Sequence, residues 1–170
     1  LLIANAGDTI FVAPGIYNEM IKPVKSGTAL MPISIIADTA SKVFTSVAPG
    51  PAIIDGNDYN IDIINVSYIT VIGLTFQNSF VNCLRLYSST SDVKGINIKG
   101  CKFSISPLMT GTPATLVYLN SETGRKISDV SITKCTFINN ESTKNSRPIV
   151  LGGEENSNIK IASNVFQMSA

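Results

Sequence analysis

Four runs of alternating apolar and polar residues, each ending in phenylalanine, recur along the chain. They are ITVIGLTF (69–76), INIKGCKF (96–103), VSITKCTF (130–137) and IKIASNVF (159–166). Their terminal phenylalanines are 27, 34 and 29 residues apart. Alternation with a period of two residues indicates β-strands, and recurrence at a similar interval indicates a repeat architecture. The fold therefore has to place equivalent residues at equivalent positions in successive repeats.

A second column of short apolar runs precedes the phenylalanine runs, and a polar turn joins each pair. These runs are IDIIN (61–65), CLRLY (83–87), TLVYL (115–119) and PIVLGG (148–153). Each repeat thus holds at least two strands, and no segment shows a sustained helical period. Parallel stacking explains the matching columns better than a sandwich, in which alternate antiparallel runs need not resemble one another. We predict an all-β chain built as a parallel β-helix, a solenoid of about five to six coils.

Stacking predicts which residues face the core, because equivalent positions of neighbouring parallel strands lie about 4.8 Å apart. Stacked parallel side chains rarely reach the torsion of a disulfide, so Cys101 and Cys135 are predicted to be neighbouring buried thiols rather than a bridge. Asn164 follows them in its column and is predicted to bond the backbone of the turn. The four predicted columns are Ile69, Ile96, Val130 and Ile159; Val71, Ile98, Ile132 and Ile161; the four phenylalanines; and Leu74, Cys101, Cys135 and Asn164.

The composition indicates an ordered globular protein and argues against nucleic acid, a membrane span and a zinc site. Hydrophobic residues make up 44% of the chain, charged residues 15%, and the net charge is +1. A net charge this close to zero gives no overall electrostatic attraction for nucleic acid, and the sequence has no block of like charge that would give a local one. Every apolar run is too short to span a membrane. The three cysteines are far apart and histidine is absent, so no zinc site is expected.

The length suits one domain over residues 1–170, with a continuous core. The chain starts at Leu1 without methionine and without a leader of basic, apolar and small residues. We therefore expect it to be part of a longer chain.

The segments GDTIFVAPGIYNE (7–19), SGTALMPISIIAD (26–38), AIIDG (52–56) and SYITVIGLTFQNS (67–79) form a distinctive opening. This opening resembles that of right-handed parallel β-helix proteins of the pectin-lyase-like superfamily. It looks closest to the polysaccharide lyase branches that include alginate lyase, chondroitinase B and certain pectate lyases. The resemblance implies a right-handed coil, a uronate-containing polysaccharide as ligand, and a location outside the cell or at its surface. The pattern also occurs in β-helix proteins that are not enzymes, so it predicts the fold more specifically than the activity.

The phenylalanine runs line the carbohydrate groove if the resemblance holds, and their outward positions carry lysines but no carboxylate. Calcium-dependent lyases need clustered oxygen ligands, and hydrolases of this fold need paired carboxylates; neither pattern is visible. Asp55 and Asp58 are interpreted as turn residues rather than metal ligands. No catalytic residue and no metal ligand is assigned, no cofactor is evident, and calcium is expected only through the resemblance. The candidate substrate-binding residues are Lys99, Lys102, Lys134 and Lys160, with Arg85 on the neighbouring strand.

These observations leave two functions open. In the first, the domain binds an acidic polysaccharide through its cations and, if it is an enzyme, cleaves the polymer by β-elimination. The alternative interpretation of these cations is that they are ordinary solvated side chains. In the second, the chain is a non-catalytic structural or adhesive solenoid of a cell surface, appendage or virion. The second function predicts end-to-end or self association, because the last run, NVFQMSA, ends without a polar cap.

Overall fold

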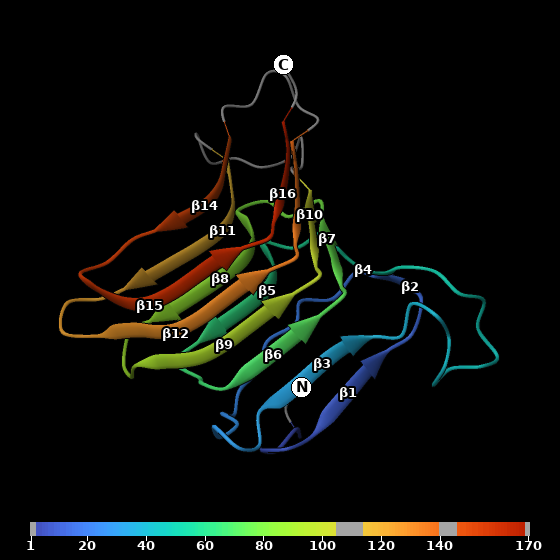
Figure 1. The fold of residues 1–170 in the computed structure, drawn as a ribbon, viewed down its shortest axis with the longest axis horizontal. Helices are drawn as coiled ribbons and strands as arrows, with labels where there is room; N and C mark the ends of the chain where they lie inside the picture. Colours follow the sequence, from blue (N-terminus) through green and yellow to red (C-terminus); the bar gives the residue numbers. More distant parts are fainter. Residues whose placement is uncertain (1–2, 105–113, 140–145, 169–170) are drawn as a thin grey trace.

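The computed structural model describes residues 3–104, 114–139 and 146–168, and in this part of the chain it contains strands and no helix. The strands form three sheets in which every pair is parallel (Figure 1). Sheet A contains β1 (Thr9–Val12), β3 (Ile33–Ala37), β6 (Ile69–Ile72), β9 (Val93–Lys99), β12 (Lys126–Thr133) and β15 (Glu155–Ala162), in this spatial order. Sheet B contains β2 (Gly15–Tyr17), β4 (Ala52–Asp55), β7 (Thr75–Gln77), β10 (Lys102–Ser104), β13 (Thr136–Asn139) and β16 (Val165–Met168). Sheet C contains β5 (Tyr59–Ile64), β8 (Asn82–Ser88), β11 (Ala114–Ser121) and β14 (Ser146–Leu151).

From β3 onward the chain visits sheets A, B and C in turn and then returns to sheet A beside its previous strand, whereas the first repeat reaches sheet C only through the isolated bridge of Ile21 to Ile61. Figure 1 shows this progression in sheet A, from β1 in blue to β15 in red. Parallel neighbours that are always one repeat apart are compatible with the predicted parallel β-helix. The all-β class and the parallel stacking predicted from the repeats are thus confirmed.

Each phenylalanine run bends once and contributes to two sheets, so a full repeat has three strands. ITVI of the first run is β6 in sheet A, and its terminal phenylalanine lies in β7 of sheet B. The bend needs a residue with left-handed backbone, which glycine adopts at least cost. At this corner the four runs place Gly73, Gly100, Lys134 and Ser163, with φ of 73°, 62°, 56° and 57°.

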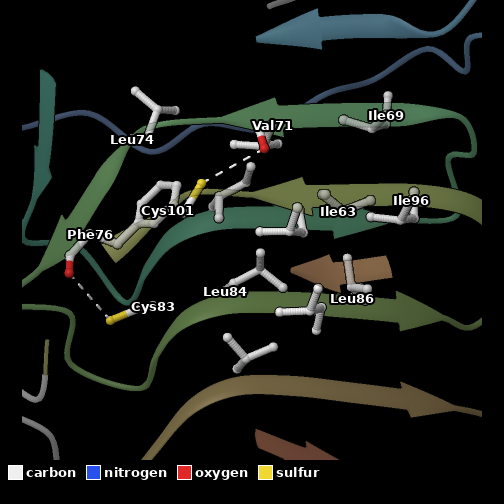
Figure 2. Close-up of a cluster of buried hydrophobic side chains, with 14 of the residues drawn as sticks. Ile63, Ile69, Val71, Leu74, Phe76, Cys83, Leu84, Leu86, Ile96 and Cys101 are labelled. Carbon is white, nitrogen blue, oxygen red and sulfur yellow. Dashed lines mark hydrogen bonds between the residues drawn. The ribbon is translucent and has the colours of Figure 1, made fainter. Parts of the chain in front are cut away.

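The core contains the predicted columns. In Figure 2, Ile69 and Val71 of β6 point into the same interior as Leu84 and Leu86 of sheet C. The phenylalanines of the four runs stack face to face, with ring centroids 5.1, 5.1 and 5.0 Å apart. The Ile69 and Val71 columns follow the register between strands and extend to Ile33 and Ile35 of β3. Exposure increases in the outermost strands of the described residues: Ile10 of β1 is partly buried, and Ile161 of β15 is 42% exposed.

The cysteine column also has the predicted arrangement. Cys101 and Cys135 are buried and free, and Cys101 directs its sulfur to the Val71 carbonyl oxygen at 3.7 Å (Figure 2). A hydrogen bond between the two thiols raises the pKa of Cys101 and lowers that of Cys135. Asn164 accepts a hydrogen bond from the Cys135 backbone N–H at 2.8 Å and donates to the Ile132 carbonyl oxygen at 2.9 Å. The side-chain bonds of Asn164 to the turn backbone are therefore confirmed.

The buried thiol of Cys83 predicts a loss of stability in alkali. Burial raises the pKa of Cys83 to about 12 from its ordinary value of 9.0, because the thiolate is desolvated in the core. A pKa that is higher in the folded state contributes stability below pH 9, and this contribution is lost as the pH rises from about 9 to about 12. We expect the wild type to lose up to about 1.4 kcal/mol more per pH unit in this range than Cys83→Ala. Urea denaturation of both proteins between pH 8 and 11 measures the difference, and parallel curves would contradict it.

Candidate functional site

Three of the predicted lysines come together at the corner between sheets A and B. Lys99 ends β9, Lys102 begins β10, and Lys134 occupies the bend between β12 and β13. The register pairs Lys99 with Thr133, the residue before Lys134, so the lysines belong to two adjacent repeats. All three side chains are exposed. We call Lys99, Lys102 and Lys134 the lysine corner.

Lys134 holds a backbone conformation that its side chain does not favour. Its φ of 56° is left-handed, whereas the preceding two repeats place Gly73 and Gly100 at the same bend. The hydrogen bond from the Gly100 N–H to the Thr133 carbonyl oxygen has its counterpart one repeat later, from the Lys134 N–H to the Ala162 carbonyl oxygen. A side chain in this region costs about 1–2 kcal/mol relative to glycine. The next repeat places Ser163 at the same bend with a φ of 57°, so the left-handed backbone is required by the corner and not by the lysine side chain.

Lys160 lies apart from the lysine corner, on the outer face of sheet A and in its last strand. The register continues a ladder of neutral polar side chains to Lys160, and no carboxylate interrupts this ladder. These side chains are half-buried and present hydroxyl and amide groups to the surface. The ladder consists of Ser34, Thr70, Asn97 and Ser131.

None of the four lysines is within ion-pair distance of a carboxylate in the described part of the chain, where the one ion pair joins Arg85 to Asp62. Two other lysines have partners of different kinds: Lys25 donates to Asn5 Oδ1 at 2.8 Å, and Lys94 lies 5.7 Å from the centre of the Tyr68 ring. Among residues 3–104, 114–139 and 146–168, the lysine corner therefore has no ion-pair partner.

Arg85 belongs to sheet C, so the structure does not bring it to the lysine corner. Its guanidinium binds Asp62 with two parallel hydrogen bonds, Nε to Oδ1 at 2.7 Å and Nη2 to Oδ2 at 2.8 Å. A third donor, Nη1, reaches the hydroxyl of Tyr59 at 3.1 Å. The bond with Asp62 raises the pKa of Arg85 further above its already high value. These bonds use three of its five donors, which makes Arg85 a poorer partner for a ligand than the lysines.

Tyrosines surround this ion pair, and sequence reasoning did not identify them. The Arg85 guanidinium lies 4.0 Å from the centre of the Tyr59 ring and 5.5 Å from that of Tyr87, within the range of cation–π attraction. Tyr87 donates its hydroxyl hydrogen to Glu122, and this bond raises the pKa of Tyr87. The register places Tyr118 beside Arg85. Alternation within CLRLY predicts that residues 85 and 87 lie on one face of the strand, so the contact between Arg85 and Tyr87 could be predicted from the sequence. The contact with Tyr59 could not, because it depends on the register between strands.

The acids at the corner between sheets B and C bond within the protein. Asp55 accepts hydrogen bonds from Gln77 Nε2 and Asn78 Nδ2, both at 2.8 Å. The carbonyl oxygen of Asp58 accepts the Val81 N–H at 2.9 Å. Asp55 thus ends β4 and binds side chains of the next repeat rather than its own backbone, and Asp58 lies in the bend that follows. Across residues 3–104, 114–139 and 146–168, no group of three or more histidine, cysteine, aspartate or glutamate side chains is arranged to hold a metal ion.

Comparison with models of known protein families and with curated protein sequences gives no match to this chain. No helix in the described residues is long and apolar enough to cross a membrane.

Proposed function

We propose that the chain is a right-handed parallel β-helix of about five to six coils, of the pectin-lyase-like type, that binds an acidic polysaccharide outside the cell or at its surface. One observation carries the proposal: three exposed lysines from two adjacent repeats meet at one corner and have no carboxylate partner among the described residues. Such a cluster complements a polymer whose sugar residues each carry a carboxylate.

The geometry suits an extended ligand better than a small anion. Lys99 and Lys134 come from neighbouring repeats, whose strands are about 4.8 Å apart along the stack. Lys102 adds a third charge on the far side of the bend. Single exposed ion pairs contribute about 0–1 kcal/mol, so useful affinity requires several carboxylates to bind at once, as they do in a uronate polymer.

The same lysines supply groups that β-elimination requires. One ammonium neutralises the uronate carboxylate, which makes the neighbouring carbon-bound proton more acidic, and a second lysine or arginine acts as the base that accepts this proton. The electron pair of the broken C–H bond forms the carbon–carbon double bond, the bond to the leaving sugar oxygen breaks, and this oxygen takes a proton from water; the products are an unsaturated uronate and a new chain end. An assay for unsaturated product on alginate, pectate and chondroitin across a calcium series distinguishes a binding domain from a lyase.

Removing the lysine corner is expected to weaken polysaccharide binding about tenfold or more, because three charge contacts of a few tenths to 1 kcal/mol each are lost. The variant combines Lys99→Gln, Lys102→Gln and Lys134→Gly, the last restoring the glycine found in the preceding repeats. Isothermal titration at low salt with alginate, pectate and chondroitin measures the effect. Because Gly relieves the left-handed strain at residue 134, denaturation should show no loss of stability from that change.

The matched control carries the same change in net charge at lysines elsewhere: Lys22→Gln, Lys42→Gln and Lys126→Gln. It should keep near wild-type affinity, and neutral dextran should bind to neither protein. Equal losses in both triple variants would show that only net charge matters. Absence of wild-type binding to all three acidic polymers would overturn the proposal.

A further inference from the structure

One repeat crosses the corner between sheets A and B differently from the others. β6 and β7 are separated by the short bend at Gly73, whereas β3 and β4 are separated by residues 38–51, which extend to the side of the stack in teal in Figure 1. A hydrogen bond from the Gly50 N–H to the Thr39 carbonyl oxygen, at 3.0 Å, joins the two ends of the projecting part. We call residues 39–50 the Asp38 loop. Compact surface loops whose ends are joined in this way often have a function.

One carboxylate holds the start of the Asp38 loop. Asp38 is only 7% exposed, and its Oδ1 accepts the Lys42 N–H at 2.8 Å. Its Oδ2 accepts the N–H groups of Val43 and Phe44 at 2.7 and 2.9 Å. Asp38 is itself fixed to sheet A, because its own N–H donates to the Val12 carbonyl oxygen at 2.9 Å. Hydrogen bonds to an ionised carboxylate are about twice as strong as neutral ones, so the charge of Asp38 stabilises the closed loop.

Other interactions hold the loop weakly. Val43 and Val47 are 51% and 37% exposed, so the loop buries little apolar surface. Apart from the bonds to Asp38, the hydrogen bond described for residues 42–49 is internal, from the Val47 N–H to the Phe44 carbonyl oxygen. Ser41 opposes closure, since its φ is 52° and its buried hydroxyl oxygen has no hydrogen-bond partner among the described residues. Segments with these properties open locally at a low cost in free energy.

We propose that the charged Asp38 carboxylate keeps the Asp38 loop closed, and that loss of this charge lets residues 39–50 open as a unit while the three sheets stay folded. Opening exposes the N–H groups of residues 42–44 to water and leaves Asp38 attached to sheet A. This inference does not depend on polysaccharide binding, because no lysine of the lysine corner belongs to the Asp38 loop or to β3 and β4 beside it.

The loop is therefore expected to respond to acid. Burial alone would raise the pKa of Asp38, but the hydrogen bonds from Phe44, Lys42 and Val43, together with the charge of Lys42, lower this pKa below its ordinary value of 3.8. Lys42 is the charged residue that acts on Asp38 among the described residues, and the neighbouring strands β1, β3 and β6 contain no charged residue. Because the pKa is lower in the closed loop, the carboxylate stabilises closure fully above pH 3.8, and this stabilisation is lost as the pH falls from 3.8 through the lowered pKa.

Hydrogen exchange measured by mass spectrometry tests the release at neutral pH. Asp38→Asn replaces one accepting oxygen by an amide that donates, and Asp38→Ala removes both oxygens. Each substitution should increase the exchange of the amides of residues 42–44 about tenfold or more, while the amides of the sheets exchange as in the wild type. Asp58→Asn is the matched control, since it removes one negative charge from an exposed aspartate outside the loop; it should exchange as the wild type does.

Trypsin gives a second readout, because Lys42 is the one lysine or arginine between residues 39 and 50. The N–H of the peptide bond that trypsin would cleave belongs to Val43 and is bonded to Asp38, so cleavage requires the loop to open. Both Asp38 variants should be cut after Lys42 about tenfold faster than the wild type and Asp58→Asn. Urea denaturation of the uncut proteins establishes that the sheets remain folded.

An acid series completes the test. Relative to an unstructured peptide at each pH, the wild-type loop should lose protection below pH 3.8, whereas the loop of Asp38→Ala should exchange at a constant high rate. The proposal is overturned if neither Asp38 variant increases exchange or tryptic cleavage in the loop. It is also overturned if the loop and the sheets lose protection together at neutral pH, or if acid affects the loop of Asp38→Ala as much as that of the wild type.

Discussion

Replacing Phe103 by alanine is expected to lower the free energy of unfolding by about 3–5 kcal/mol. Phe103 is fully buried and stacks on Phe76 and Phe137, with both centroid separations at 5.1 Å. The substitution removes a large apolar side chain, leaves a cavity, and interrupts two aromatic contacts at once. Since small domains are stable by only about 5–15 kcal/mol, the loss is a large fraction of the total. Urea denaturation measures it as a lower midpoint with an unchanged slope.

The control is the same substitution at the end of the same column. Phe166 is 49% exposed and stacks on one ring, Phe137, with a centroid separation of 5.0 Å. Phe166→Ala should therefore cost about half as much as Phe103→Ala or less, because less apolar area is buried there. Equal losses at the two positions would contradict the stacked column as the main support of sheet B.

Replacing Arg85 by alanine is expected to cost about 3 kcal/mol or more, although it removes a surface cation. The loss comes mainly from Asp62, which is 2% exposed and would be left as an unpaired buried carboxylate. Removing both partners in Arg85→Ala with Asp62→Ala should cost clearly less than the sum of the two single losses, by about 1–3 kcal/mol. A double-mutant cycle in urea measures this coupling.

Two further variants sharpen the Arg85 result. Arg125→Ala changes an exposed arginine without a carboxylate partner in the described residues and should change stability by about 0.5 kcal/mol or less. Arg85→Lys keeps the charge but loses the planar, two-bond contact with Asp62, so it should recover only part of the loss. Strict additivity of the Arg85 and Asp62 substitutions would show that the pair is not coupled. A coupled pair supports a structural role for Arg85.

The repeat pattern was sufficient to predict how the core is built. Alternation within the phenylalanine runs is local, and it identifies inward residues such as Val71 and Ile98 without knowledge of the partner strand. The recurrence of the runs then identifies which inward residues stack. The split of each run into two strands was not predicted, because a bend at Gly73 looks like an ordinary residue within a strand until its φ of 73° is known. The equivalent bend at Lys134 could not be predicted either, since lysine rarely adopts left-handed backbone and so does not indicate it.

The candidate sites depended on contacts between distant residues. Sequence alone selected Lys99, Lys102, Lys134, Lys160 and Arg85 as one group of cations. The register separates this group: three lysines meet at one corner, Lys160 lies at the edge of sheet A, and Arg85 is bound by Asp62 in sheet C. A period of two residues says which face a side chain occupies, but not which side chain of another repeat lies beside it.

The sequence by itself therefore determined the class of fold and which residues stack in the core, because alternation within a strand and recurrence between repeats can both be seen along the chain without knowledge of the tertiary structure. Tertiary structure alone decided which charges are free and which are paired, because loops of different length set the register between repeats.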